Sequence, residues 1–315
     1  MEQKQSCKYT LKKGGLVLVF GALTSPVLAD SGIAVSAEAG YRHDNLNWNI
    51  ADVDGSPNIL SELTWSSLRI YQGKLNLEVD IKQLKFFGTA AYGTVDDGDN
   101  QDSDYLADDR QAEFSRSNNQ AGGDVADASL GIGYVFKAGV SDNFHSFVMP
   151  MAGYSLHQQN LEMTDGFQTI PATGSFDGLN SSYDAQWDGP WIGLSFWQTD
   201  IRRDFTIAFD MIYHQADYQA EATWNLRTTG DFALAQPTSF EHWADGQGIT
   251  LSLRSKYGLS RQWSFIMSLD YQNWQTDAGL DRVYPAAGGS EDTQLNRVNW
   301  DSTALNLGFE WRPGD

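Results

Sequence analysis

Strict alternation of apolar and polar residues is the feature that most constrains how this chain folds. Leucine, valine and isoleucine occupy every second position from Lys74 to Ile81, and polar or charged residues occupy the positions between them. The same two-residue period recurs from Phe205 to His214, from Trp263 to Gln272 and from Leu305 to Trp311. Because successive side chains of a β-strand point to opposite faces, this period predicts strands with one apolar and one polar face.

The spacing of these segments predicts how the strands are joined. Short links at 81–83, 200–203 and 258–261 alternate along the chain with long polar segments. Short turns at one end and long loops at the other are typical of a transmembrane barrel, with both termini at the periplasmic end. We therefore predict an all-β fold, a ten-stranded antiparallel transmembrane up-and-down β-barrel with long extracellular loops. The expected strands are 31–48, 58–80, 84–95, 123–138, 145–163, 183–199, 204–225, 244–258, 262–279 and 296–311, and the expected outer loops are 49–57, 96–122, 164–182, 226–243 and 280–295.

A soluble β-sandwich is the alternative that also has many strands. Soluble strands are usually about 5–6 residues long, whereas many of the segments predicted here are at least twice that length. Charges at polar strand positions, such as Glu78, Asp210 and Arg254, suit a wet barrel interior. These features favour the barrel. Pro150 and Pro190 fall inside predicted strands, so we expect a β-bulge at each of them.

The first residues have the pattern of a secretory leader. Four lysines precede an apolar stretch at 16–23, and small or apolar residues lead up to Ala29. This pattern predicts a signal peptide at 1–29, followed by a single outer-membrane barrel domain at 30–315. The only cysteine, Cys7, would leave with the leader, so we expect no disulfide partner.

The charge of the processed chain excludes one class of partner. Removing four lysines and Glu2 lowers the net charge from −20 to −23. Nucleic-acid binding requires a basic surface, so no nucleic-acid partner is expected. No uninterrupted apolar run after Ala29 is long enough for a membrane helix. We expect export to the outer membrane of a Gram-negative-type bacterium, with outer-membrane lipid as a partner.

Four short segments resemble the omptins, outer-membrane proteases built on a ten-stranded barrel. They are Ile59–Trp65, Asp99–Tyr105, Met151–Tyr154 and Pro190–Leu194. Each is short, but they occur in the family's order and at similar spacing across residues 31–311. The same superfamily contains a ten-stranded adhesin that lacks protease chemistry.

The resemblance implies where catalytic residues would stand. Omptins use an Asp-x-Asp pair of the second outer loop, here Asp102 and Asp104, opposite an Asp-x-His pair at the outer end of strand seven. The second pair falls on Glu221 and Thr223, so the histidine that acts as general base is absent. His242 is the one histidine that we expect as a substitute.

The second outer loop is also a candidate cation site. Residues 96–109 contain seven aspartates, and Asp97, Asp99, Asp102 and Asp104 offer the oxygen ligands that Ca²⁺ takes. The bland alternative, a solvated acidic loop, is preferred because the calcium-loop pattern lacks its final Glu. No other cofactor is expected, and a lipopolysaccharide contact stays open.

Three functions remain open from the sequence. The preferred one is an omptin-like barrel without proteolysis that binds a cationic peptide or an extracellular surface ligand through acidic loops, as an adhesin or structural protein. The second is an active omptin-type endopeptidase that uses Asp102, Asp104 and a substitute histidine. The third is a small pore, which ten strands disfavour because side chains fill narrow barrels.

Overall fold

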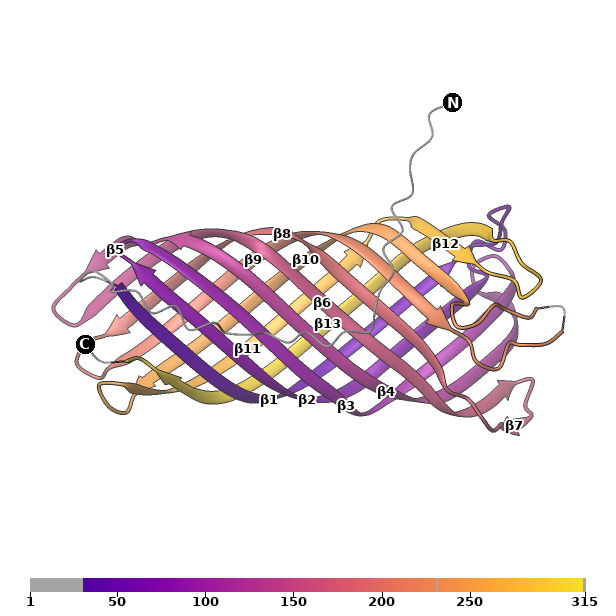
Figure 1. Cartoon of the computed structure of the whole chain (residues 1–315), viewed down its shortest axis with the longest axis horizontal. Helices are drawn as coiled ribbons and strands as arrows, with labels where there is room; N and C mark the ends of the chain where they lie inside the picture. The colour runs from indigo at the N-terminus through magenta and orange to yellow at the C-terminus, as the bar shows by residue number, and fades with distance from the viewer. Residues whose placement is uncertain (1–30, 231, 314–315) are drawn as a thin grey trace, which may run out of the picture.

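The structure, a computed structural model, describes residues 31–230 and 232–313. The predicted signal peptide therefore lies outside the described residues. Every regular element in the described part is a β-strand, and together the strands form one elongated barrel (Figure 1). The strands are β1 (Ser31–Ile50), β2 (Ser61–Ile81), β3 (Leu84–Ala107), β4 (Gln111–Tyr134), β5 (Phe136–Val140), β6 (Phe144–Ile170), β7 (Gly174–Ser175), β8 (Ser181–Asp200), β9 (Phe205–Thr223), β10 (Phe240–Gly258), β11 (Trp263–Thr276), β12 (Gly279–Val283) and β13 (Glu291–Trp311).

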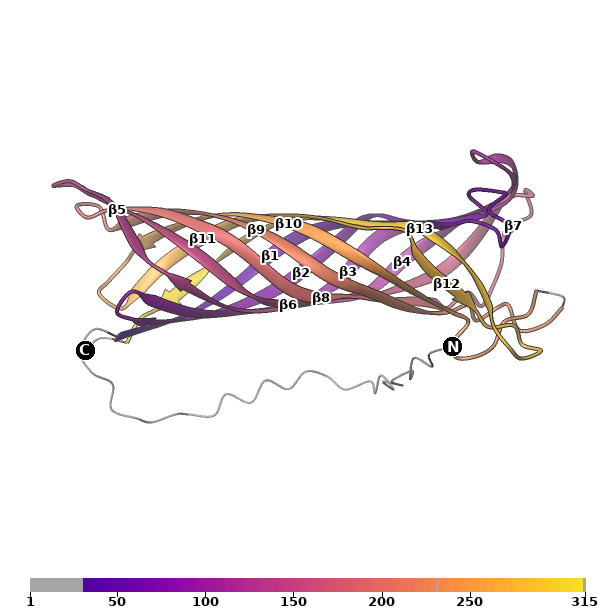
Figure 2. The same cartoon turned by 90° about the horizontal axis from the view of Figure 1, so that it is seen from above.

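The sheet closes on itself, so the predicted antiparallel barrel is confirmed. Ten long strands follow one another around the ring in the order β1-β2-β3-β4-β6-β8-β9-β10-β11-β13, and β13 pairs with β1. The short strands β5, β7 and β12 extend the sheet at its two ends (Figures 1 and 2). None of the described residues forms a helix of the length and apolar character needed to cross a membrane.

Large exposed apolar side chains mark the part of the barrel that faces lipid. Tyrosines form a ring at its outer edge, and Tyr213 is separated from Phe205 at the other edge by eight residues of β9. Eight residues correspond to about 26 Å of strand, or about 20 Å along the axis of a tilted barrel, close to the apolar band of outer-membrane barrels. The outer ring is Tyr41, Tyr71, Tyr92, Tyr154, Tyr213 and Tyr271, and the inner ring includes Tyr134, Phe144, Phe205, Tyr257, Trp263 and Trp311.

The strands continue well beyond the outer tyrosine ring, which corrects the expected loops. β3 and β4 pair across most of the segment 96–122, which therefore forms a strand hairpin with a turn at 108–110. β6 likewise runs seven residues into the expected loop 164–182, to Ile170. Outside the membrane both faces of a strand can be polar, so backbone pairing persists where the apolar alternation disappears.

The expected bulges at the two prolines are absent. The register between β6 and β8 is regular through both Pro150, opposite Leu194, and Pro190, opposite Tyr154. Pro150 lies where the pairing with β4 ends and the pairing with β5 begins, in unchanged register. A proline lacks only the N–H donor, so here it interrupts hydrogen bonding on one side without adding a residue to the strand.

The interior of the barrel is divided along its axis. Above the outer tyrosine ring, aromatic and aliphatic side chains pack into one buried cluster, the outer plug. Trp274 and Trp300 stack with ring centroids 5.5 Å apart, and Trp187 packs against Tyr218 at 4.4 Å. Within the membrane band the interior is mostly polar and charged. The largest fully buried side chains of the plug are Trp65, Trp187, Trp274, Trp300, Tyr183 and Tyr218.

Candidate functional site at the outer mouth

The two aspartates of the predicted catalytic pair point into the barrel mouth. Asp102 pairs in register with Leu63, whose side chain is buried in the outer plug, and Asp104 lies two residues further along the same face. Arg227 approaches Asp104 at 3.8 Å. Burial, followed by repulsion from Asp104, raises the pKa of Asp102 to about 7. The structure therefore brings this acidic pair together beside an arginine.

The other half of the predicted pair faces the opposite way. On β9 the buried, inward-facing residues are Ala220 and Ala222, so Glu221 and Thr223 point out of the barrel. Glu221 accepts a hydrogen bond from Thr238 (Oγ1 to Oε1, 2.6 Å) and Thr223 donates to a loop carbonyl. The structure therefore does not place Glu221 opposite Asp102, and the inward positions at the outer end of β9 hold alanines without acid–base chemistry.

His242, the candidate substitute base, is enclosed in the outer plug. Its side chain is 0 % exposed, and its Nδ1 lies 2.9 Å from the Tyr183 hydroxyl. Its Nε2 lies 3.1 Å from Asp281 Oδ1, and the Tyr183 and Tyr218 hydroxyls are 2.5 Å apart. Burial raises the pKa of Tyr183 well above its usual range. A general base must reach a water and a substrate, which this enclosed imidazole does not.

The sequence did not predict that Asp281, His242, Tyr183 and Tyr218 form one row of contacting polar side chains. Its members come from four strands, β12, β10, β8 and β9. The sequence feature that could have indicated this row is that His242, Tyr183 and Tyr218 each stand at an inward position of an alternating segment. Which inward residues meet depends on register, and a single sequence does not give the register between strands.

The four aspartates proposed for calcium are divided between two faces. Asp97 forms an ion pair with Arg69 on the outer surface, and Asp99 is exposed there as well. Asp102 and Asp104 face the interior. Among residues 31–230 and 232–313, no three carboxylate or imidazole side chains are arranged to hold a metal ion.

A second acidic feature lies on the outer surface of β8, β9 and β10, just above the tyrosine ring. Two rows of carboxylates stand in register across these strands, and we call them the acidic face. The lower row is Asp188, Asp217 and Asp245, and the upper row is Asp184, Glu221 and Glu241. Gln186, Gln219 and Trp243 separate the rows, and Arg282 of β12, opposite Glu241, lies over the Trp243 ring at the edge of the face. The sequence could have indicated this feature, because carboxylates occupy outward positions in three alternating segments.

Comparison with known proteins identifies the family of this chain and structures with a similar fold. The chain matches the family described as Pom, Protochlamydia outer membrane protein, over residues 36–312. No curated protein matches the sequence. Among solved structures, the outer membrane protease OmpT from Escherichia coli is similar at a TM-score of 0.72 with 12 % identity, covering 92 % of this chain and 99 % of that one.

Two other outer-membrane structures are less similar. The translocator domain of the autotransporter NalP from Neisseria meningitidis has a TM-score of 0.38 at 11 % identity, over 90 % of this chain and 88 % of that one. OprG from Pseudomonas aeruginosa has a TM-score of 0.34 at 13 % identity, over 91 % of this chain and 97 % of that one. The fold-level resemblance to the omptins is therefore confirmed, and the identity is too low to transfer an activity. The chain belongs to the Protochlamydia outer membrane protein family and resides in the outer membrane as a β-barrel.

Proposed function

We propose that this protein is a non-proteolytic outer-membrane barrel that binds a cationic partner on its extracellular part. The observation that carries the proposal is the acidic face. Carboxylates directly opposite one another on neighbouring strands have Cβ atoms about 5 Å apart and repel, which destabilises the sheet. A cationic ligand that lies across the three strands relieves this repulsion.

The charge elsewhere on the extracellular part supports the same reading. Four of its arginines already form ion pairs with neighbouring carboxylates: Arg69 with Asp97, Arg110 with Glu62, Arg116 with Glu113 and Arg282 with Asp292. These pairs consume positive charge locally, whereas the strand partners of the lower row, Asp188, Asp217 and Asp245, include no cationic residue. The potential there therefore attracts cationic peptides or proteins and increases their rate of association.

The same geometry argues against proteolysis. An omptin-type mechanism requires a base that faces Asp102 and Asp104 across the mouth. The inward residues at the outer end of β9 are Ala220 and Ala222, and His242 is enclosed with Tyr183 and Asp281. Thr223 does not accept a proton near neutral pH. We therefore expect cationic peptides to be bound and left uncut.

The test measures binding and cleavage of one probe. A fluorescent oligolysine peptide is added to the barrel in lipid nanodiscs, with an oligoglutamate peptide as the probe of opposite charge. We expect saturable, salt-sensitive oligolysine binding that weakens at least tenfold when Asp188, Asp217 and Asp245 are changed to Asn. The matched control changes Asp54→Asn, Asp177→Asn and Glu291→Gln, three exposed acidic residues outside the acidic face, of which Glu291 begins β13.

The outcomes separate the candidate functions. An equal loss in both triple variants would show that net charge, and not the acidic face, determines binding. Cleavage of the oligolysine peptide that disappears in Asp104→Ala would establish the peptidase instead. The pore stays a second candidate because a cavity occupies the membrane band, although the outer plug separates that cavity from the outside.

A further inference from the structure

The interior of the membrane band contains a cavity of about 690 Å³. It reaches the short turns through Lys82 and Arg261, so it opens at the periplasmic end. It ends at His157 and His214, which pack against Trp274 beneath the outer plug. Ligand pockets usually have volumes of about 300–1,000 Å³. The cavity is therefore a blind chamber of ligand size that opens away from the cell surface.

One wall of this chamber is apolar and aromatic. Met149, Met151 and Trp191 form a buried cluster, and Phe87 and Trp197 pack against it. All five side chains line the chamber, and they come from β3, β6 and β8. Buried aromatic rings of this kind hold a flat apolar group by stacking and edge contacts.

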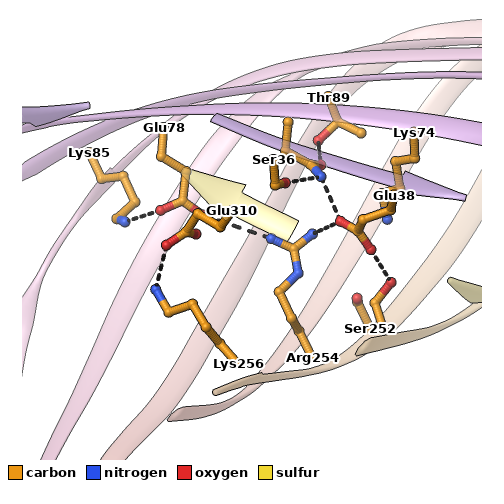
Figure 3. Close-up of polar contacts among 12 residues, drawn as sticks. Ser36, Glu38, Lys74, Glu78, Lys85, Thr89, Ser252, Arg254, Lys256 and Glu310 are labelled. Carbon is orange, nitrogen blue, oxygen red and sulfur yellow. Dashed lines mark hydrogen bonds and ion pairs between the residues drawn. The ribbon is translucent and has the colours of Figure 1, made fainter. Parts of the chain in front are cut away.

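The opposite wall is charged, and most of its cations have short partners (Figure 3). Lys85 lies 2.6 Å from Glu78, Lys256 lies 2.9 Å from Glu310, and Lys74 lies 2.8 Å from Asp270. Within each pair the two charges neutralise each other, so this wall has little net charge with which to bind a monatomic ion.

Arg254 forms only long ion pairs. Its nearest carboxylates are Glu38 at 3.6 Å and Glu78 at 3.9 Å, both beyond hydrogen-bond distance. Its guanidinium donates no hydrogen bond to another residue of the described chain, although it has five N–H donors and lines the chamber. A carboxylate is the group that satisfies such a fork with two parallel hydrogen bonds.

Asp210 is the complementary group on the neighbouring strand. It lines the chamber and hydrogen-bonds to Ser195, and Arg254 attracts it electrostatically without an ion pair within 4 Å among the described residues. Asp210 pairs in register with Ser252, which is two residues from Arg254. Asp210 and Arg254 are therefore diagonal neighbours, whose Cα atoms lie about 7–8 Å apart. Ala208 stands between Arg254 and Trp197 in the register and leaves space beside the indole.

We propose that the chamber binds a small zwitterion with an aromatic side chain, the chemistry of a free aromatic amino acid, taken up from the periplasmic side. The carboxylate of the ligand pairs with Arg254, and its ammonium pairs with Asp210. The ring packs against Trp191, Trp197 and Met149. A zwitterion suits a chamber whose charges balance, because it adds no net charge to a partly desolvated site.

The test uses three probes that differ in one group each. L-Phenylalanine has both charges, 3-phenylpropionate lacks the ammonium, and phenethylamine lacks the carboxylate. Binding is measured by calorimetry on the barrel in lipid nanodiscs, with empty nanodiscs as the blank. We expect saturable binding of L-phenylalanine, and binding at least tenfold weaker for each of the two analogues.

Two variants assign the two ends of the ligand. Arg254→Met should weaken L-phenylalanine and 3-phenylpropionate at least tenfold and leave phenethylamine unchanged. Asp210→Asn should weaken L-phenylalanine and phenethylamine and leave 3-phenylpropionate unchanged. Arg297→Met, on the extracellular part, is the matched control and should change none of them. Heat-modifiable mobility on a gel shows that each variant is folded.

Three results would overturn the inference. The first is the absence of saturable L-phenylalanine binding to the unaltered barrel. The second is equal binding of the zwitterion and its two analogues, which would show that neither charge is recognised. The third is an equal loss of all three ligands in a folded variant, which would mean that the residue supports the chamber without contacting a charged end of the ligand.

Discussion

At the scale of single residues, the enclosed His242 is the clearest example of a side chain whose surroundings decide its role. It lies between Tyr183 and Asp281, and Asp281 also accepts a hydrogen bond from Thr293 (Oγ1 to Oδ2, 2.7 Å). Buried polar groups that are partnered in this way fix the packing of the elements that carry them. We interpret His242 as a structural residue that ties β10 to β8 and β12.

Replacing His242 by Leu should therefore destabilise the barrel. Asp281, 1 % exposed, would keep the hydrogen bond from Thr293 and lose the imidazole beside its other carboxylate oxygen, and the buried Tyr183 hydroxyl would lose its contact with His242 Nδ1. A buried polar group left without its partner costs about 1–3 kcal/mol. Denaturant unfolding of the refolded barrel measures this loss, with His43→Leu, at a half-buried outward position of β1, as the control. A change of less than about 0.5 kcal/mol would contradict the structural role.

Asp102 gives the barrel a pH dependence of known sign. The folded pKa of Asp102 is raised to about 7, above the usual value of an unfolded aspartate near 3.9. Between these values the folded state binds more protons than the unfolded state, so this group lowers stability as pH rises from about 4 to 7.

Asp102→Asn removes this titration and should stabilise the barrel relative to the unaltered protein. The gain should be near zero at pH 4 and rise to roughly 1–2 kcal/mol at pH 7, allowing for solvent screening. Unfolding midpoints across this pH range measure the gain, with Asp54→Asn as the exposed control. A gain that falls as pH rises would contradict the assigned environment.

At the scale of elements, the packing of Trp191 explains two of the segments that resemble omptins. Its indole lies against the backbone of β4 and β6, where a Cβ on Gly131 or Gly153 would come within 2.5 Å of a ring atom. Both glycines therefore leave room for the ring, and Trp191 Nε1 donates to Ser129 at 3.1 Å. Met151–Tyr154 and Pro190–Leu194 are thus two halves of one contact.

Gly153→Ala should destabilise the barrel, by about 1–3 kcal/mol, because the added methyl group overpacks the indole. Trp191→Leu in the same chain should recover part of this loss. A double-mutant cycle on unfolding free energies measures the coupling, for which contacting residues give about 0.5–3 kcal/mol. Gly73→Ala is the control, since a Cβ there would meet nothing within 4 Å. Strictly additive effects would show that the two residues do not constrain each other.

Strand register determines how much of the site the sequence could predict. The alternation on β9 correctly predicted a strand, but it did not decide which face Glu221 occupies. A shift of one residue moves every side chain to the other face, and the inward residues are Ala220 and Ala222. The acidic pair Asp102 and Asp104 was found from its motif, whereas its surroundings depend on strands that are distant in sequence.

The extended hairpins beyond the membrane were not predictable for a different reason. Hydrophobic alternation arises where one face meets lipid and the other meets water. Between Asp96 and Gln120 both faces contain polar residues, so the pattern disappears while β3 and β4 remain paired. The strand signal of the sequence therefore ends near the tyrosine ring, and the backbone pairing does not.

At the scale of the whole molecule, the barrel separates three environments along its axis. The extracellular part combines the acidic face with an apolar interior, the membrane band contains the chamber, and the short turns border its opening. Diffusion through the barrel would require a continuous aqueous path. The outer plug interrupts this path with fully buried tryptophans, among them Trp65, Trp187 and Trp300.

The central proposal is that the barrel acts through its outer surface and is closed to flow through its interior. The most direct measurement is single-channel current across planar bilayers that contain the purified protein, with insertion verified by flotation of the same preparation with liposomes. The closed plug predicts no resolved conductance steps. Large, stable steps from the unaltered barrel would contradict this claim and establish the pore.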